Sequence, residues 1–189
     1  LLAASVLIAC FGASAASRPI PPPPKAPSRW MSLDDAGRQA AIETVAPLDL
    51  PSRLLAMSQN FLLTPYLDSP LGEGAGFDAD PPMRFDAVDC LTFVEESIAL
   101  AMSRSLADVK PRLDQVRYAD EVTYEGRNHL MEAEWLPNNS KKGFLRDLTP
   151  MIGGEQAVPV TKKISNRTWG SRSAQALALP KPRQVEGAF

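Results

Sequence analysis

The segment from Cys90 to Ser103 constrains the fold more than any other part of the chain. Its apolar residues recur with the spacing of an α-helix, at Leu91, Val94, Ile98 and Ala101 or Met102. No proline interrupts the chain before Pro111. Asp86 or Asp89 can serve as the N-cap, which places Cys90 in the first turn of the predicted helix.

A cysteine in the first turn of a helix is a candidate nucleophile. The unpaired backbone N–H groups and the positive end of the helix dipole favour the thiolate over the thiol. The thiolate is the form that attacks carbonyl carbons. The alternative for Cys90 is a buried structural cysteine, which is the commoner case for a lone cysteine without context.

Residues 1–17 have the pattern of an export signal. The apolar run Leu1–Phe11 is too short to span a membrane and is followed by small residues. Two processing routes stay open: ordinary cleavage near Ala13-Ser14-Ala15, or lipidation of Cys10, since Leu7-Ile8-Ala9-Cys10 resembles the bacterial lipobox. Residues 18–30 contain many prolines, which predicts an extended spacer. We therefore expect an exported protein of the periplasm or cell envelope, with a membrane lipid anchor as one possibility.

The cysteine count bears on Cys90. The chain has two cysteines, and Cys10 is removed or acylated by either route. Cys90 is then left without a partner in the chain, and a free thiol in an oxidising compartment suggests reactivity or intermolecular pairing.

Other segments predict a mostly helical chain. Helices are expected from Ser32 to about Val45, from Pro51 through Leu62, and over Leu106–Val116 if Pro111 lies in the first turn. An irregular loop is expected over Ser69–Pro82. Arg117–Tyr124 fits either a strand or an irregular arm, and the chain from Pro150 onward is expected to be weakly structured.

His129 is the only histidine in the chain and hence the visible candidate for a general base beside Cys90. A Cys/His pair needs proximity in the fold rather than in sequence. A structural histidine or a substrate contact are the alternatives. A metal site built from His129, Glu132 and Glu134 has poor support, because zinc sites usually contain further Cys or His ligands.

Composition is that of a globular protein, with 44% hydrophobic and 22% charged residues and a net charge of -2. Basic residues outnumber acidic ones after residue 140, but they are scattered among Pro, Gly and Ser. That distribution argues against nucleic-acid binding.

Several motifs in order carry a resemblance to a known family. They are Asp89-Cys90-Leu91-Thr92-Phe93-Val94-Glu95, Arg117-Tyr118, Arg127-Asn128-His129, Trp135-Leu136-Pro137-Asn138-Asn139, the run Gly143 to Thr149, and Gly153-Gly154. Together they resemble the N-acetylmuramoyl-L-alanine amidase-like family of bacterial NlpC-type cysteine hydrolases. The resemblance implies an α+β, papain-like fold over residues 31–189, of which this chain holds mainly the helical N-terminal half.

The resemblance also implies a function. The substrate would be peptidoglycan or muropeptides, and the scissile bond would be the amide between N-acetylmuramic acid and L-alanine of the stem peptide. Cys90 would be the nucleophile, with His129 as candidate base and Asp89, Tyr124 and Trp135 as candidate substrate-binding residues. No cofactor is required.

The family places its usual catalytic histidine in a later His-x-Gly segment that this sequence does not contain. We therefore expect a fragment that is inactive or poorly folded by itself, with Leu91, Val94 and Ile98 partly exposed. The alternative function is a non-catalytic, membrane-anchored envelope protein that binds wall fragments or a partner.

Overall fold

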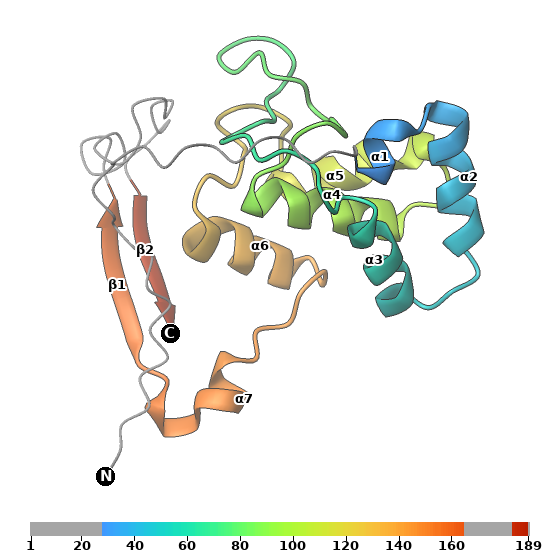
Figure 1. Cartoon of the computed structure of the whole chain (residues 1–189). Coiled ribbons are helices and arrows are strands. Elements are labelled where there is room, and N and C mark those ends of the chain that lie inside the picture. Colours follow the sequence, from blue (N-terminus) through green and yellow to red (C-terminus); the bar gives the residue numbers. More distant parts are fainter. Residues whose placement is uncertain (1–27, 165–182, 189) are drawn as a thin grey trace, which may run out of the picture.

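The computed structural model describes residues 28–164 and 183–188. Helices dominate this part of the chain, and Figure 1 shows α1 to α5 gathered into one body. The predicted export signal, Cys10 and most of the predicted spacer lie outside the described residues.

Three short helices open the described chain, and a polar side chain caps each of them. They are α1 (Arg29–Ser32), α2 (Asp35–Val45) and α3 (Leu50–Gln59). Asp34 accepts a hydrogen bond from the Gly37 N–H at 2.8 Å, and Asp49 accepts one from the Ser52 N–H at 2.9 Å. The helix expected from Ser32 thus begins later, with Asp34 as its N-cap.

Two longer helices follow, α4 (Cys90–Met102) and α5 (Leu106–Arg117). Helix α4 packs against both α3 and α5. Pro111 lies inside α5 rather than in its first turn, which corrects the sequence expectation. The helix tolerates it because Pro111 is exposed, as is Ala107, whose carbonyl loses the usual hydrogen bond.

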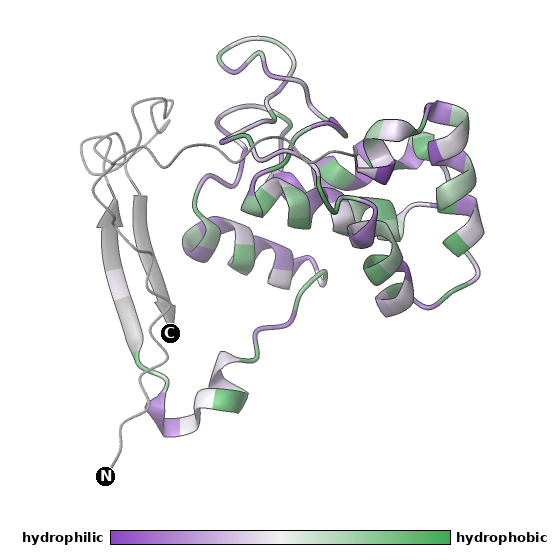
Figure 2. Cartoon of the chain, in the orientation of Figure 1, coloured by the Kyte–Doolittle hydropathy of each residue, from purple (hydrophilic) through white to green (hydrophobic). Residues whose placement is uncertain are grey.

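The core is formed by apolar residues of α1 to α5 and of the segments between them, and it includes a group of aromatic rings. Trp30 is fully buried, and its Nε1–H donates to the Met57 carbonyl at 3.2 Å. Its ring centroid lies 6.0 Å from that of Phe61 and 5.4 Å from that of Phe85. Figure 2 shows apolar and polar residues alternating along these helices, as expected for helices with one buried face.

Two irregular segments connect the helices on one side of the body. The loop over residues 69–82 folds back on itself, with the Glu73 N–H donating to the Asp78 carbonyl at 2.9 Å and the Gly74 N–H to the Asp80 carbonyl at 2.8 Å. The arm over residues 118–130 is irregular rather than a strand, since its regular pairing is a single bridge between Tyr118 and Arg127.

Short elements complete the described chain. They are η1 (Met131–Trp135, a π-helix), α6 (Leu136–Lys141), α7 (Thr149–Gly153), η2 (Gly154–Gln156), β1 (Pro159–Ile164) and β2 (Arg183–Ala188). The chain after Pro150 is therefore more regular than expected. Strands β1 and β2 pair antiparallel, with Pro159 opposite Ala188, and the ribbon lies apart from α1–α5 in Figure 1.

The expected α+β, papain-like fold is wrong for the described residues, which are mostly helical. The resemblance implied that, in such a fold, the Cys90 helix would pack its apolar face on an antiparallel sheet. Instead, α4 is covered by α3 and α5, and no sheet within residues 28–164 and 183–188 covers it. Val94 remains 37% exposed, and Leu91 and Ile98 are half-buried, so the expected partial exposure of these three side chains is confirmed.

Candidate functional site

Cys90 is the first residue of α4, as the helical pattern predicted, and its thiol is free and exposed. The position results from a strong local start signal. Asp89 is the N-cap, and its Oδ1 accepts hydrogen bonds from the N–H groups of Leu91 at 3.0 Å and Thr92 at 2.7 Å. Thr92 completes a capping box, because its Oγ1 accepts from the Asp89 N–H at 2.8 Å.

The cap decides which backbone groups remain available beside the thiol. Leu91 and Thr92 donate to the Asp89 side chain, and the Phe93 N–H donates to the Asp89 carbonyl at 3.0 Å. The N–H of Cys90 itself is the one first-turn amide that the cap does not use. The Asp89 carboxylate also offsets part of the positive end of the helix dipole.

Tyr66 and Val94 flank Cys90. Burial raises the pKa of Tyr66, and the nearby acidic groups, Asp68 and Asp89 among them, raise it further. Tyr66 is held by a parallel bridge to Val88, two residues before Cys90. Val94 lies one helical turn beyond Cys90 on the same face. The thiol therefore lies on an exposed surface that includes Val94.

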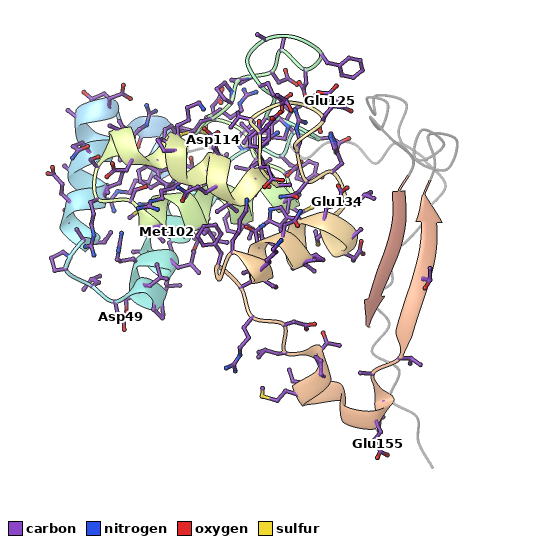
Figure 3. The ribbon with its side chains drawn as sticks, turned by 180° about the vertical axis from the view of Figure 1, so that it is seen from behind. Asp49, Met102, Asp114, Glu125, Glu134 and Glu155 are labelled. Carbon is purple, nitrogen blue, oxygen red and sulfur yellow. The ribbon has the colours of Figure 1, made fainter. Side chains whose placement is uncertain are left out.

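His129 lies at the end of the irregular arm and is half-buried. Its Nε2 lies 2.6 Å from the carbonyl oxygen of Tyr124, and its backbone N–H donates to Glu134 Oε2 at 2.8 Å. A carbonyl oxygen only accepts, so Nε2 carries the proton in this contact and the basic lone pair of the neutral ring belongs to Nδ1. Figure 3 labels Glu134, close to the start of α6.

The candidate substrate-binding residues are all engaged with other parts of the protein. Tyr124 is 7% exposed and packs edge-on against His129, with ring centroids 4.5 Å apart. Trp135 is 3% exposed, beside Glu95. Asp89 Oδ2 accepts from the Ser69 N–H at 3.2 Å. Roles of these residues in substrate binding stay predictions.

Sequence reasoning missed two buried carboxylates on the Cys90 helix. Glu95 and Glu96 are 2% and 0% exposed. Burial raises the pKa of Glu95 to about 7, against the opposing effects of Arg117 and Trp135. Burial raises the pKa of Glu96 to about 8. Among the hydrogen bonds of the described residues, only the Arg84 N–H, at 3.1 Å, donates to the Glu96 side chain. The sequence signal that could have revealed them is the pair of adjacent acidic residues within an otherwise apolar helical pattern.

A cluster of charged residues joins the loop to the arm, and it too was missed. Arg127 Nη2 lies 2.6 Å from Glu73 Oε2 and 2.8 Å from Asp78 Oδ2. The Tyr118 hydroxyl donates to Glu73 Oε1 at 2.9 Å. All three charged side chains are at most 10% exposed. Burial alone would lower the pKa of Arg127, but hydrogen bonds to both carboxylates raise it above its usual value.

Neither a metal cluster nor a membrane-spanning helix is found in the part of the chain that the structure describes. No group of three or more His, Cys, Asp or Glu residues there could hold a metal ion, and His129, Glu132 and Glu134 do not form one. No described helix is long and apolar enough to cross a membrane.

The geometry can be set beside that of known proteins. A Legionella pneumophila protein of the DUF1460 family is similar with a TM-score of 0.68 and 23% identity, over 82% of this chain and 62% of that chain. An N-acetylmuramoyl-L-alanine amidase from Bacteroides uniformis is similar with a TM-score of 0.51 and 25% identity, over 65% of this chain and 50% of that chain. No curated protein matches.

The model of one protein family matches residues 56–183, which is more than half of the chain. The chain belongs to the AmiA-like family, whose members are N-acetylmuramoyl-L-alanine amidase-like. It spans between half and two thirds of the length of the solved structures above. The family part of the sequence prediction is thereby confirmed.

Proposed function

We propose that this chain carries the nucleophile of a peptidoglycan amidase, which cleaves the amide between N-acetylmuramic acid and L-alanine of the stem peptide. The observation that carries the proposal is the exposed thiol of Cys90 at the first residue of α4, in a chain of an amidase-like family. The B. uniformis relative is itself an N-acetylmuramoyl-L-alanine amidase, which supports the choice of bond.

The reaction would proceed by nucleophilic catalysis. The Cys90 thiolate attacks the lactyl carbonyl carbon, a C–S bond forms, and the oxyanion is stabilised by backbone donors. The Cys90 N–H is the first-turn candidate for that task, because the Asp89 cap uses the following amides. The C–N bond then breaks as the amine of L-alanine takes a proton, and water hydrolyses the thioester to release the carboxylate and the thiol.

His129 is our candidate for the group that takes the thiol proton and passes it to the amine. Its basic Nδ1 suits this role because the Tyr124 carbonyl engages Nε2. A histidine elsewhere in the whole protein is the competing assignment. His129→Gln tests it: a proton-transfer role predicts a lower kcat and loss of the limb of the pH–rate profile near neutrality, whereas an unchanged profile excludes His129.

The test of the main proposal uses Cys90→Ala in the full-length protein. The substitution should abolish release of stem peptide from purified muropeptides while the thermal unfolding curve stays the same. Cys90→Ser is the matched control, since it keeps a hydroxyl of similar size but is a far weaker nucleophile. Equal turnover by wild type and Cys90→Ala would exclude the enzymatic interpretation.

A second candidate function is a non-catalytic envelope protein that is exported, anchored through Cys10 and binds wall fragments. The contact of His129 Nε2 with a backbone carbonyl favours this alternative, because the same contact is typical of a structural histidine. A thiol-selective probe separates the two functions. An activated Cys90 should be alkylated rapidly at pH 6–7, and an ordinary thiol should not.

A further inference from the structure

The loop over residues 69–82 contacts residues that lie next to each of the two candidate catalytic residues in sequence. At its beginning, the Ser69 N–H donates to Oδ2 of Asp89, the N-cap that sets the first turn of the Cys90 helix. Just before it, the Leu67 N–H donates to the Val88 carbonyl at 3.1 Å, and the Val88 N–H donates to the Pro65 carbonyl at 3.0 Å. One end of the loop is thus attached directly to the residues that precede Cys90.

The middle of the same loop holds the arm that carries His129. Glu73 and Asp78 both bind the Arg127 guanidinium, and Arg117 Nη2 donates to the Leu71 carbonyl. Arg127 lies two residues before His129, and its guanidinium lies 5.1 Å from the centroid of the Tyr124 ring. Tyr124 in turn contacts the His129 ring through its own ring and its carbonyl oxygen.

These contacts form one continuous path from Cys90 to His129. It runs from the Asp89 cap through Ser69 and the loop to Glu73 and Asp78, and then through Arg127 and Tyr124 to the imidazole. A planar guanidinium with five donors fits such a junction, because it can bind two carboxylates in fixed directions. Its burial between them keeps solvent from screening the pairs.

We propose that Arg127 is a positioning residue, which holds His129 in a fixed relation to Cys90 by clamping the arm to the loop through Glu73 and Asp78. This inference rests on the proposed function, in which both residues take part in one reaction. Misplacement of a reacting group by about 1 Å can lower a rate roughly 100-fold. Loss of the clamp should therefore lower kcat more than it changes KM.

The test compares Arg127→Gln and Arg127→Lys with Lys110→Gln in the full-length protein. Lys110→Gln is the matched control because it removes an exposed ion pair, Lys110–Asp114, far from the path in sequence. Kinetics on muropeptides are corrected for the folded fraction, taken from the unfolding curve of each variant, so that unfolded protein does not count. Arg127→Gln should lose roughly 10- to 100-fold in kcat, Arg127→Lys should lose less, and the control should match wild type.

Hydrogen exchange supplies a readout that does not depend on turnover. In Arg127→Gln, the amides of Ser69 and Gly74 should exchange faster, and the Thr92 amide at the Cys90 end should follow them. If wild type does not hydrolyse muropeptides, the proposed function fails, while faster exchange at both ends still supports the mechanical link. The inference is overturned if Arg127→Gln keeps the kcat of wild type and its Ser69 and Thr92 amides exchange as slowly as those of wild type.

The milder substitution Glu73→Gln covers the case in which Arg127→Gln does not fold. It keeps the shape of the side chain and leaves Asp78 to bind Arg127, so the clamp is weakened rather than removed. It should give a smaller loss of kcat and faster exchange at Gly74. Wild-type behaviour in both measurements would also overturn the inference.

Discussion

Replacing Glu96 with Gln should stabilise the protein above neutral pH. Glu96 is fully buried on α4, and its pKa is raised from 4.5 to about 8. Burial is the main cause; the Arg84 N–H opposes the shift, and the negative charge of Glu95 adds to it. Gln resembles the protonated carboxyl in size and keeps an oxygen that can accept from Arg84, but it never becomes charged.

The sign and the size follow from proton linkage. A raised pKa means that the folded state retains a proton that the unfolded state releases, so stability falls as the pH rises from about 4.5 through about 8. Each pKa unit corresponds to about 1.4 kcal/mol, which gives a ceiling of about 5 kcal/mol for this one side chain. That is a large share of the typical net stability of about 5–15 kcal/mol.

Urea unfolding at intervals between pH 5 and pH 9 measures the effect. Wild type should lose stability across this range, and Glu96→Gln should flatten the curve and exceed wild type at pH 8–9. Glu125→Gln is the control, because Glu125 is exposed in a loop and is labelled in Figure 3. Its stability should change with pH as that of wild type does. If Glu96→Gln is less stable than wild type at pH 8, or if wild type shows no loss, the reasoning about this buried carboxyl is wrong.

Three further outcomes are expected. Trp30→Ala should lower the free energy of unfolding by about 3–5 kcal/mol in urea titrations, since it empties a fully buried aromatic site; a loss below 1 kcal/mol would contradict the assigned core. Asp89→Ala should cost about 1–2 kcal/mol, because two amides lose their cap; an unchanged urea midpoint would argue against that cap. If Cys10 is lipidated, the protein expressed with its native start should partition with membranes and Cys10→Ser should alter its processing; a soluble wild type beginning near Ala16 would favour ordinary signal cleavage.

The Cys90 helix was predictable because its signals are local. An aspartate before the first turn, a threonine three residues later and an apolar repeat of helical period act within a few residues of one another. The structure accordingly begins α4 at Cys90 and uses Asp89 as its cap. Pro111 shows the limit of such rules. The free-energy cost of a proline inside a helix depends on whether the carbonyl that loses its hydrogen bond is exposed, and here Ala107 is exposed.

The clamp at Arg127 could not be predicted in the same way. Glu73 and Asp78 lie in a loop whose path the sequence described only as irregular, about 50 residues before Arg127. Their pairing depends on how the loop folds back, and that in turn depends on backbone hydrogen bonds within it. The sequence showed the charges but not which of them would meet.

By itself, the sequence determined that Cys90 begins a helix and that the chain resembles an amidase-like family, because caps, periodicity and motifs are properties of short segments. Only the tertiary structure decided that α3 and α5, and no sheet in the described residues, cover α4. It also decided that Glu95 and Glu96 are buried and that His129 contacts the Tyr124 carbonyl. Burial and long-range pairing depend on which surfaces meet, and no local pattern encodes that choice.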